Sequence, residues 1–188
     1  MQDKFKNSFL IAAPGIDDAV FSRTLILLLE KSSQGSFGIV VNREGSFALS
    51  EACKQLGYPA PKVDRLFGWG GPVYPRTAFV LHSLQGDWKS TGFTNVKADI
   101  AMTISDDILQ AIAAGEGPEK TYPVLGCAMW EAGQLEKELE EGVWLGLQAE
   151  SKIVFDVPLA ERYEAALALI GIDTNTAGNV LSDELGHA

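Results

Sequence analysis

Four side chains in this sequence could take part in small-molecule chemistry, and they come from two segments. His82 lies near the end of the apolar run 77–83, whereas Trp130, Glu131 and Gln134 lie where another apolar run gives way to a helical pattern. A strand end followed by a helix start presents free N–H groups, beside which polar side chains gather. In a shared pocket, His82 would be the general acid–base, Glu131 would orient it and Trp130 would stack on a ligand. The competing interpretation is structural: a hydrogen-bonded histidine, a packed tryptophan and a capping Glu/Gln pair.

The segment 68–72, Gly-Trp-Gly-Gly-Pro, raises the question of a phosphate-binding loop. A Walker loop needs a lysine and a hydroxyl residue after its last glycine, whereas Pro72 and Val73 follow Gly71 here. The sequence therefore favours a tight connection between strands, which needs the backbone freedom of glycine. The alternative is a weak anion-binding nest made by the N–H groups of Gly70 and Gly71.

Metal binding and nucleophilic catalysis find little support in the sequence. The chain has two cysteines and two histidines, and no two of these four lie within the short spacings of a zinc site. We therefore predict no metal and no cofactor. The sequence contains no complete set of catalytic residues, which argues against an enzyme. Cys127 and His82 could form a thiolate–imidazole pair, but Cys127 lies in an apolar strand pattern, where a free cysteine usually packs. Four glutamates scatter around the helix expected at 131–142 and are expected to face solvent: Glu136, Glu138, Glu140 and Glu141.

The net charge of −10 is unevenly placed along the chain. Residues 1–130 carry 13 acids against 12 bases, whereas residues 131–188 carry 12 acids against 3 bases. Nucleic acids and anionic membranes attract clustered cations, so we expect no direct contact with either. A basic protein partner for the C-terminal third stays open beside the simpler interpretation, a solvated acidic face. The apolar runs are too short to span a bilayer, and we expect a cytoplasmic protein.

Apolar runs and turn signals follow one another in an order typical of an α+β domain with a mixed or antiparallel sheet. Six runs predict strands, at 8–14, 24–30, 36–42, 77–83, 122–130 and 151–157. The polar link 31–35 between two of them predicts a hairpin. Helical patterns lie at 46–57, 104–118, 131–142 and 158–171, the second with Ser105 as N-cap and Gly115 as stop. We expect one domain over residues 1–173 and a frayed tail at 174–188.

Several blocks of the chain, from about residue 7 to 173, resemble the AlgH/YqgE family of bacterial proteins. They include FLIAAPGIDDAVFSRTLILLLE, WGGPVYPRTAFVLHS and GCAMWEAGQLEKELEEGVWL. The resemblance implies a single α+β domain whose bifurcated sheet closes partly into a small barrel surrounded by helices. It implies no catalytic residues, and the family's label of putative transcriptional regulator comes from a genetic connection to alginate production. The family's recurrent positions fall here on Asp18, Phe21, Arg23, Gly38, Asn42, Gly70, Gly71, Pro72, His82, Trp130, Gly133, Gln134, Leu135 and Trp144.

Three functional hypotheses follow. The first is a regulatory or interaction domain of unknown biochemical activity that acts through a protein partner and not by direct DNA binding. The second is a small-molecule-binding protein or enzyme with a pocket near His82, Trp130, Glu131 and Gln134. The third is self-association through a sheet edge or an apolar patch, and the sequence leaves the oligomeric state open. We prefer the first hypothesis, because it requires no reaction beyond what the sequence shows.

Overall fold

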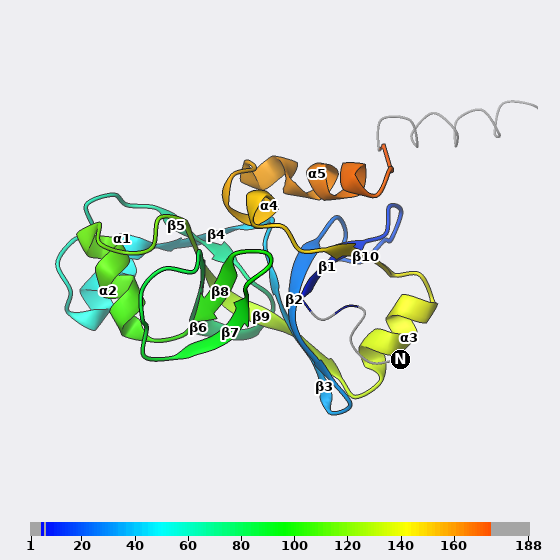
Figure 1. The fold of residues 1–188 in the computed structure, drawn as a ribbon, viewed down its shortest axis with the longest axis horizontal. Helices are drawn as coiled ribbons and strands as arrows, with labels where there is room; N and C mark the ends of the chain where they lie inside the picture. Colours follow the sequence, from blue (N-terminus) through cyan, green and yellow to red (C-terminus); the bar gives the residue numbers. More distant parts are fainter. Residues whose placement is uncertain (1–4, 6, 174–188) are drawn as a thin grey trace, which may run out of the picture.

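Ten strands form one strongly curled sheet in the computed structural model, which describes residues 5 and 7–173 (Figure 1). Eight of them follow the order β10-β1-β2-β3-β9-β6-β8-β7, and β4 joins the sheet through β5, which pairs with β9. The bounds are β1 Ser8–Ala12, β2 Leu25–Ser32, β3 Gly35–Val40, β4 Glu44–Ala48, β5 Leu66–Trp69, β6 Val73–His82, β7 Thr91–Asn95, β8 Ile100–Thr103, β9 Thr121–Glu131 and β10 Trp144–Gln148.

The long strand β9 connects the two halves of this sheet. Its first half pairs with β6 and its last residues pair with β3, while β5 runs parallel beside its middle. The pairings other than β5–β9 are antiparallel, and the sheet curls into a half-barrel. The predicted α+β fold with a bifurcated, partly closed sheet is therefore confirmed, as is the hairpin at 31–35.

Strand β1 and the first five residues of β2 are buried on both faces, which explains the apolar runs at 9–12 and 25–29. Side chains of a strand alternate between faces, so Phe9 and Ile11 belong to the core inside the curl, whereas Leu10 and Ala12 belong to the core on the other face. The second core contains Trp130 as well. Consecutive residues of one strand thus serve two separate cores.

Five α-helices and one 3-10 helix in the described part of the chain cover this sheet: α1 Leu49–Leu56, α2 Asp106–Ala114, α3 Gln134–Glu140, α4 Ser151–Phe155, η1 Leu159–Glu161 and α5 Arg162–Leu169. The pair α1 and α2 lies at one end of the molecule, α4 and α5 lie along one side of the curl, and α3 lies near the end of β9 (Figure 1). As the sequence predicts, Gly115 ends α2, and both it and Gly57 at the end of α1 have the left-handed conformation. None of the helices in this part of the chain is long and apolar enough to cross a membrane.

The prediction of a strand at 151–157 is wrong, because residues 151–155 form helix α4. Its β-branched Ile153 and Val154 are buried in the core inside the curl, together with Tyr163 and Leu167 of α5. Intrinsic propensity is a weak preference that tertiary burial overrides. Strands β4, β5, β7, β8 and β10 were not predicted, and the expected frayed tail lies outside the described residues.

Candidate functional site

The four predicted site residues lie at opposite ends of β9. His82 of β6 pairs with Thr121 at the beginning of β9, whereas Trp130 comes nine residues later on the same strand. Nine residues of extended chain span roughly 30 Å. The structure therefore separates His82 from Trp130, Glu131 and Gln134, and the predicted shared pocket of all four does not form.

His82 is a buried structural residue, with 2% of its surface exposed. Its Nδ1 lies 2.8 Å from the carbonyl oxygen of Ser83, and its Nε2 lies 2.9 Å from Oγ1 of Thr103. Trp88 packs edge-on against the imidazole, with ring centroids 6.5 Å apart. Burial lowers the pKa of His82 below its ordinary value, partly opposed by the bond to Ser83. Both ring nitrogens are occupied by the chain itself, which leaves none for a ligand.

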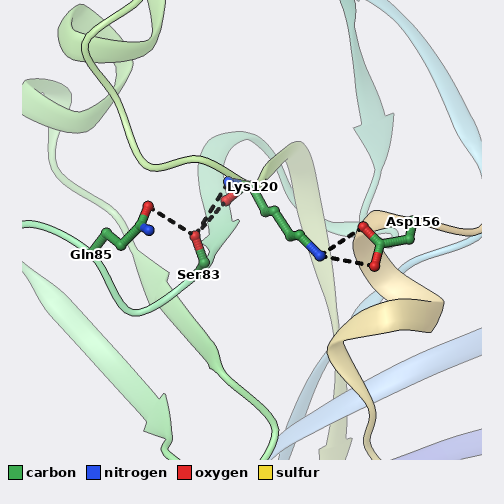
Figure 2. Close-up of polar contacts among 4 residues, drawn as sticks. All are labelled: Ser83, Gln85, Lys120 and Asp156. Carbon is green, nitrogen blue, oxygen red and sulfur yellow. Dashed lines mark hydrogen bonds and ion pairs between the residues drawn. The ribbon is translucent and has the colours of Figure 1, made fainter.

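The polar contacts beside His82 join β9 to the C-terminal helices (Figure 2). Ser83 Oγ accepts a hydrogen bond of 3.2 Å from the backbone N–H of Lys120, and Gln85 accepts one of 2.7 Å from the N–H of Glu119. The Lys120 side chain extends to Asp156 at the end of α4, with Nζ 2.8 Å from one carboxylate oxygen. These contacts fix the start of β9.

The glycine segment and the cysteine also have structural roles. The N–H of Gly70 donates 2.8 Å to the carbonyl of Leu125, so it has no hydrogen left for an anion and the proposed nest is wrong. A Cβ on Gly71 would lie 2.2 Å from the backbone of Cys127, which explains the need for glycine at this close approach. Burial raises the pKa of the Cys127 thiol to about 11, so it is not a thiolate at neutral pH.

Trp130 and Gln134, by contrast, line a cavity of about 290 Å³. It lies between the loop that follows β1, the end of β9, α3 and the start of β10. Glu131 is exposed and does not line the cavity, although its backbone N–H donates 3.0 Å to Gln134 Oε1 and so orients that side chain. The lining residues are Ala12, Ile16, Asp17, Asp18, Phe21, Met129, Trp130, Gln134, Glu138, Val143 and Trp144.

Glu138 is the centre of the hydrogen-bond network in this cavity. Its Oε2 accepts the indole N–H of Trp130 at 2.9 Å and that of Trp144 at 2.7 Å, and its Oε1 accepts the amide of Gln134 at 2.9 Å. Gln134 and Glu138 are four residues apart and therefore share one face of α3. Gly133, with φ of +78°, turns the chain between β9 and α3, which brings that face over the tryptophans.

The loop after β1 supplies the opposite wall. Asp18 Oδ1 accepts the N–H groups of Val20 at 2.8 Å and Phe21 at 2.7 Å, which places the Phe21 ring against Trp144. Those two backbone bonds also hold the pKa of the Asp18 carboxyl below its usual value. Arg43 supports the same loop, because its guanidinium donates 2.9 Å to the carbonyl of Ser22.

Three aromatic rings and three carboxylates define the chemistry of the cavity. Trp144 meets Phe21 at 70° and Trp130 at 82°, with centroids 5.9 and 6.0 Å apart, so successive rings form walls at steep angles. Asp17, Asp18 and Glu138 line the cavity, and no basic residue does. Such a site attracts a cation or a hydrogen-bond donor.

Sequence reasoning identified Trp130 and Gln134 but missed the residue that organises them. Glu138 is wrongly expected to face solvent, because the pattern of glutamates on α3 does not show which one approaches the indoles. The spacing of four from Gln134 was the available signal. Asp18, Phe21 and Trp144 appeared only as recurrent positions of the resembled family. Among the described residues, no group of three or more His, Cys, Asp or Glu is arranged to hold a metal ion.

Comparisons with known proteins agree with this architecture. A family model described as AlgH-like matches residues 9–175. A UPF0301 protein of Chromobacterium violaceum is 42% identical over 183 residues, 96% of this chain and 95% of the relative. The solution structure of AlgH from Pseudomonas aeruginosa is 39% identical, has a TM-score of 0.78 and covers 100% of this chain and 98% of that one. A crystal structure from Corynebacterium diphtheriae, 20% identical with a TM-score of 0.67 over 87% of this chain and 85% of that one, shares the fold.

Proposed function

The chain belongs to the AlgH-like family, and we propose that it is a binding domain that acts through a protein partner, without direct contact to DNA and without a reaction of its own. The observation that carries this proposal is the cavity at the end of β9, with its aromatic walls and its carboxylates. Tryptophan in a well-packed pocket is characteristic of the residues that dominate protein–protein binding.

The size and surroundings of the cavity favour a protein over a free metabolite. Pockets for drug-sized ligands hold about 300–1,000 Å³, so a cavity of about 290 Å³ suits one side chain of a partner better. Met129 lies at the cavity with 48% of its surface exposed, and methionine adapts readily to a docked surface.

Charge supports a protein partner rather than DNA. The net charge is −10, and residues 131–188 carry 12 acids against 3 bases. Binding to a nucleic acid depends on cations that replace the counterions of phosphate, and an acidic surface repels the duplex. A basic surface on a protein would be attracted instead.

The small-molecule hypothesis retains the same cavity but loses its acid–base chemistry. His82 lies at the other end of β9, and the buried Cys127 thiol is protonated at neutral pH. What remains of that hypothesis is binding of a small cation, without catalysis.

A cavity variant tests the protein-partner proposal. Tagged wild-type protein is cross-linked in its native host, and the proteins recovered are quantified against those recovered with Met129→Arg and Ile104→Arg. Met129 lies at the cavity, whereas Ile104 is similarly exposed, at 51%, and does not line it. We expect one partner that Ile104→Arg retains and Met129→Arg loses. Equal recovery with both variants, or no stoichiometric partner, would overturn the proposal.

A further inference from the structure

Resting on the proposed function, we propose that the cavity receives the guanidinium group of an arginine side chain that the partner presents. The proposal combines the unbalanced charge of the lining residues, the arrangement of the rings and an acceptor position that Glu138 leaves free.

Three carboxylates and no basic residue line the cavity, although Arg43 behind the loop partly offsets the charge of Asp18. Asp17 and Asp18 lie on the loop after β1, and Glu138 faces them from α3. The three donors that Glu138 receives, two indoles and one amide, are neutral, so its charge is stabilised without a counter-ion. A cation that enters between these walls gains attraction from both sides.

Glu138 also retains hydrogen-bonding capacity. A carboxylate offers about four lone-pair sites, and the three bonds in the network leave one, on Oε1. A guanidinium has five N–H donors in a planar fork, so it can fill this site and reach a second carboxylate. The ammonium of lysine is a compact, strongly hydrated point charge and lacks this planar geometry.

The rings suit a planar cation. Trp144 makes edge-to-face contacts with both Phe21 and Trp130, and all three rings line the cavity. Arginine binds aromatic faces by cation–π attraction and by stacking. The chain already makes this contact within itself, because the guanidinium of Arg162 lies 4.6 Å from the ring centroid of Tyr122.

The test follows the indole N–H signals of the ¹⁵N-labelled full chain by NMR. The probe is arginine capped as acetyl and methylamide, and its neutral isostere is the capped citrulline. We expect the Trp130 and Trp144 signals to shift with the arginine probe, with a Kd on the order of 1 mM for so small a ligand. Signals of Trp69 and Trp88 should stay in place, and added salt should weaken binding. Equal shifts with citrulline, or no shift at either indole, would overturn the proposal.

Two variants and one matched control locate the binding. Glu138→Gln should weaken binding of the arginine probe about tenfold, because it removes a charged acceptor. Asp17→Asn should weaken it as well, and this exposed residue lies outside the Glu138 network, so folding is not at risk. Glu140→Gln removes the same charge from an exposed position of α3 that does not line the cavity. Equal weakening by all three variants would mean general electrostatic attraction and contradict the site.

Failure of this inference can be told apart from failure of the proposed function. If Met129→Arg abolishes partner capture while the arginine probe shifts neither indole signal, the protein-partner proposal is retained and the proposal of an arginine ligand is rejected. If the arginine probe binds as expected but no captured protein depends on Met129, the cavity binds a guanidinium and the protein-partner proposal is rejected. Agmatine adds a third arm: tighter binding of this free guanidine than of the capped arginine would assign the cavity to a small cation and overturn the partner's arginine.

Discussion

The two ends of β9 hold polar residues beside tryptophans, yet they differ in what they leave available. At the start of the strand, His82 is 2% exposed and both of its nitrogens bond to the chain itself. At the end of the strand, Glu138 bonds to two indoles and an amide but still borders a cavity of about 290 Å³. The polar groups at the start of β9 are thus bonded within the chain, whereas those at its end border an open cavity.

This difference teaches that a polar residue in an apolar setting indicates function only when the fold leaves part of its bonding capacity unused. A buried group that is fully satisfied contributes to stability and to the choice of one structure. A group that is partly satisfied beside open space can bind. We therefore expect substitutions at the start of β9 to alter stability alone, and those at its end to alter stability and binding together.

The largest effect is expected from Trp144→Ala, because Trp144 is 4% exposed and packs against both Phe21 and Trp130. Removal of a buried tryptophan costs about 3–5 kcal/mol of unfolding free energy. The matched variant is Trp88→Ala at the other end, where the indole is only half-buried. Urea denaturation followed by circular dichroism measures both, and a larger loss for Trp88→Ala would break the comparison.

His82→Ala should cost about 2–3 kcal/mol, since it removes a buried ring together with its hydrogen bonds to Ser83 and Thr103. The Ser83 carbonyl keeps the N–H of Gln85 and the Thr103 hydroxyl keeps the hydroxyl of Thr91, so neither group is left unpaired. Binding of the capped arginine at Trp130 and Trp144 should be unchanged, because the two sites lie at opposite ends of β9. The variant is measured by urea denaturation and then by NMR titration below its unfolding midpoint. A change in arginine affinity would show that the two ends are coupled and that the histidine is more than structural.

The sequence predicts the fold better than the site, for a physical reason. Residues 9–12 of β1 and 25–29 of β2 are continuous apolar runs that only burial on both faces can satisfy, so pattern alone identifies them. Helix α4 was misread because its burial comes from contacts with α5, which a local pattern does not contain.

The site depends on such distant contacts throughout. Trp130 and Gln134 were identified because they are neighbours at a strand end, and His82 was grouped with them for its chemistry alone. The register of β6 against β9 decides that His82 belongs elsewhere. Likewise, which glutamate of α3 meets the indoles depends on the turn at Gly133 and on the position of β10. None of these distances follows from the composition of the segments.

A smaller effect on stability is expected from Glu138→Gln. The glutamine retains an oxygen that can accept the indole N–H groups, but these bonds lose the strength that a charged acceptor gives them. We expect a loss of about 1 kcal/mol, the difference between charged and neutral hydrogen bonds. Urea denaturation with Glu140→Gln as control measures it. A loss as large as that of Trp144→Ala would mean that the carboxylate is chiefly structural, like His82.

The smallest effect concerns pH and returns to the start of β9. Burial holds the pKa of His82 in the folded protein below its ordinary value, so the unfolded chain takes up a proton first as pH falls through about 6.5. The unfolded state then binds more protons than the folded state, and stability must decrease with falling pH. Urea midpoints measured from pH 7.5 to 5.5 should fall for the wild type and fall less for His82→Gln. The pKa values of the Asp18 and Glu136 carboxyls are lowered by hydrogen bonds, so these two groups stay ionised across this window. An equal decline of the urea midpoint in both proteins would mean that protonation of His82 is not the cause of the pH dependence.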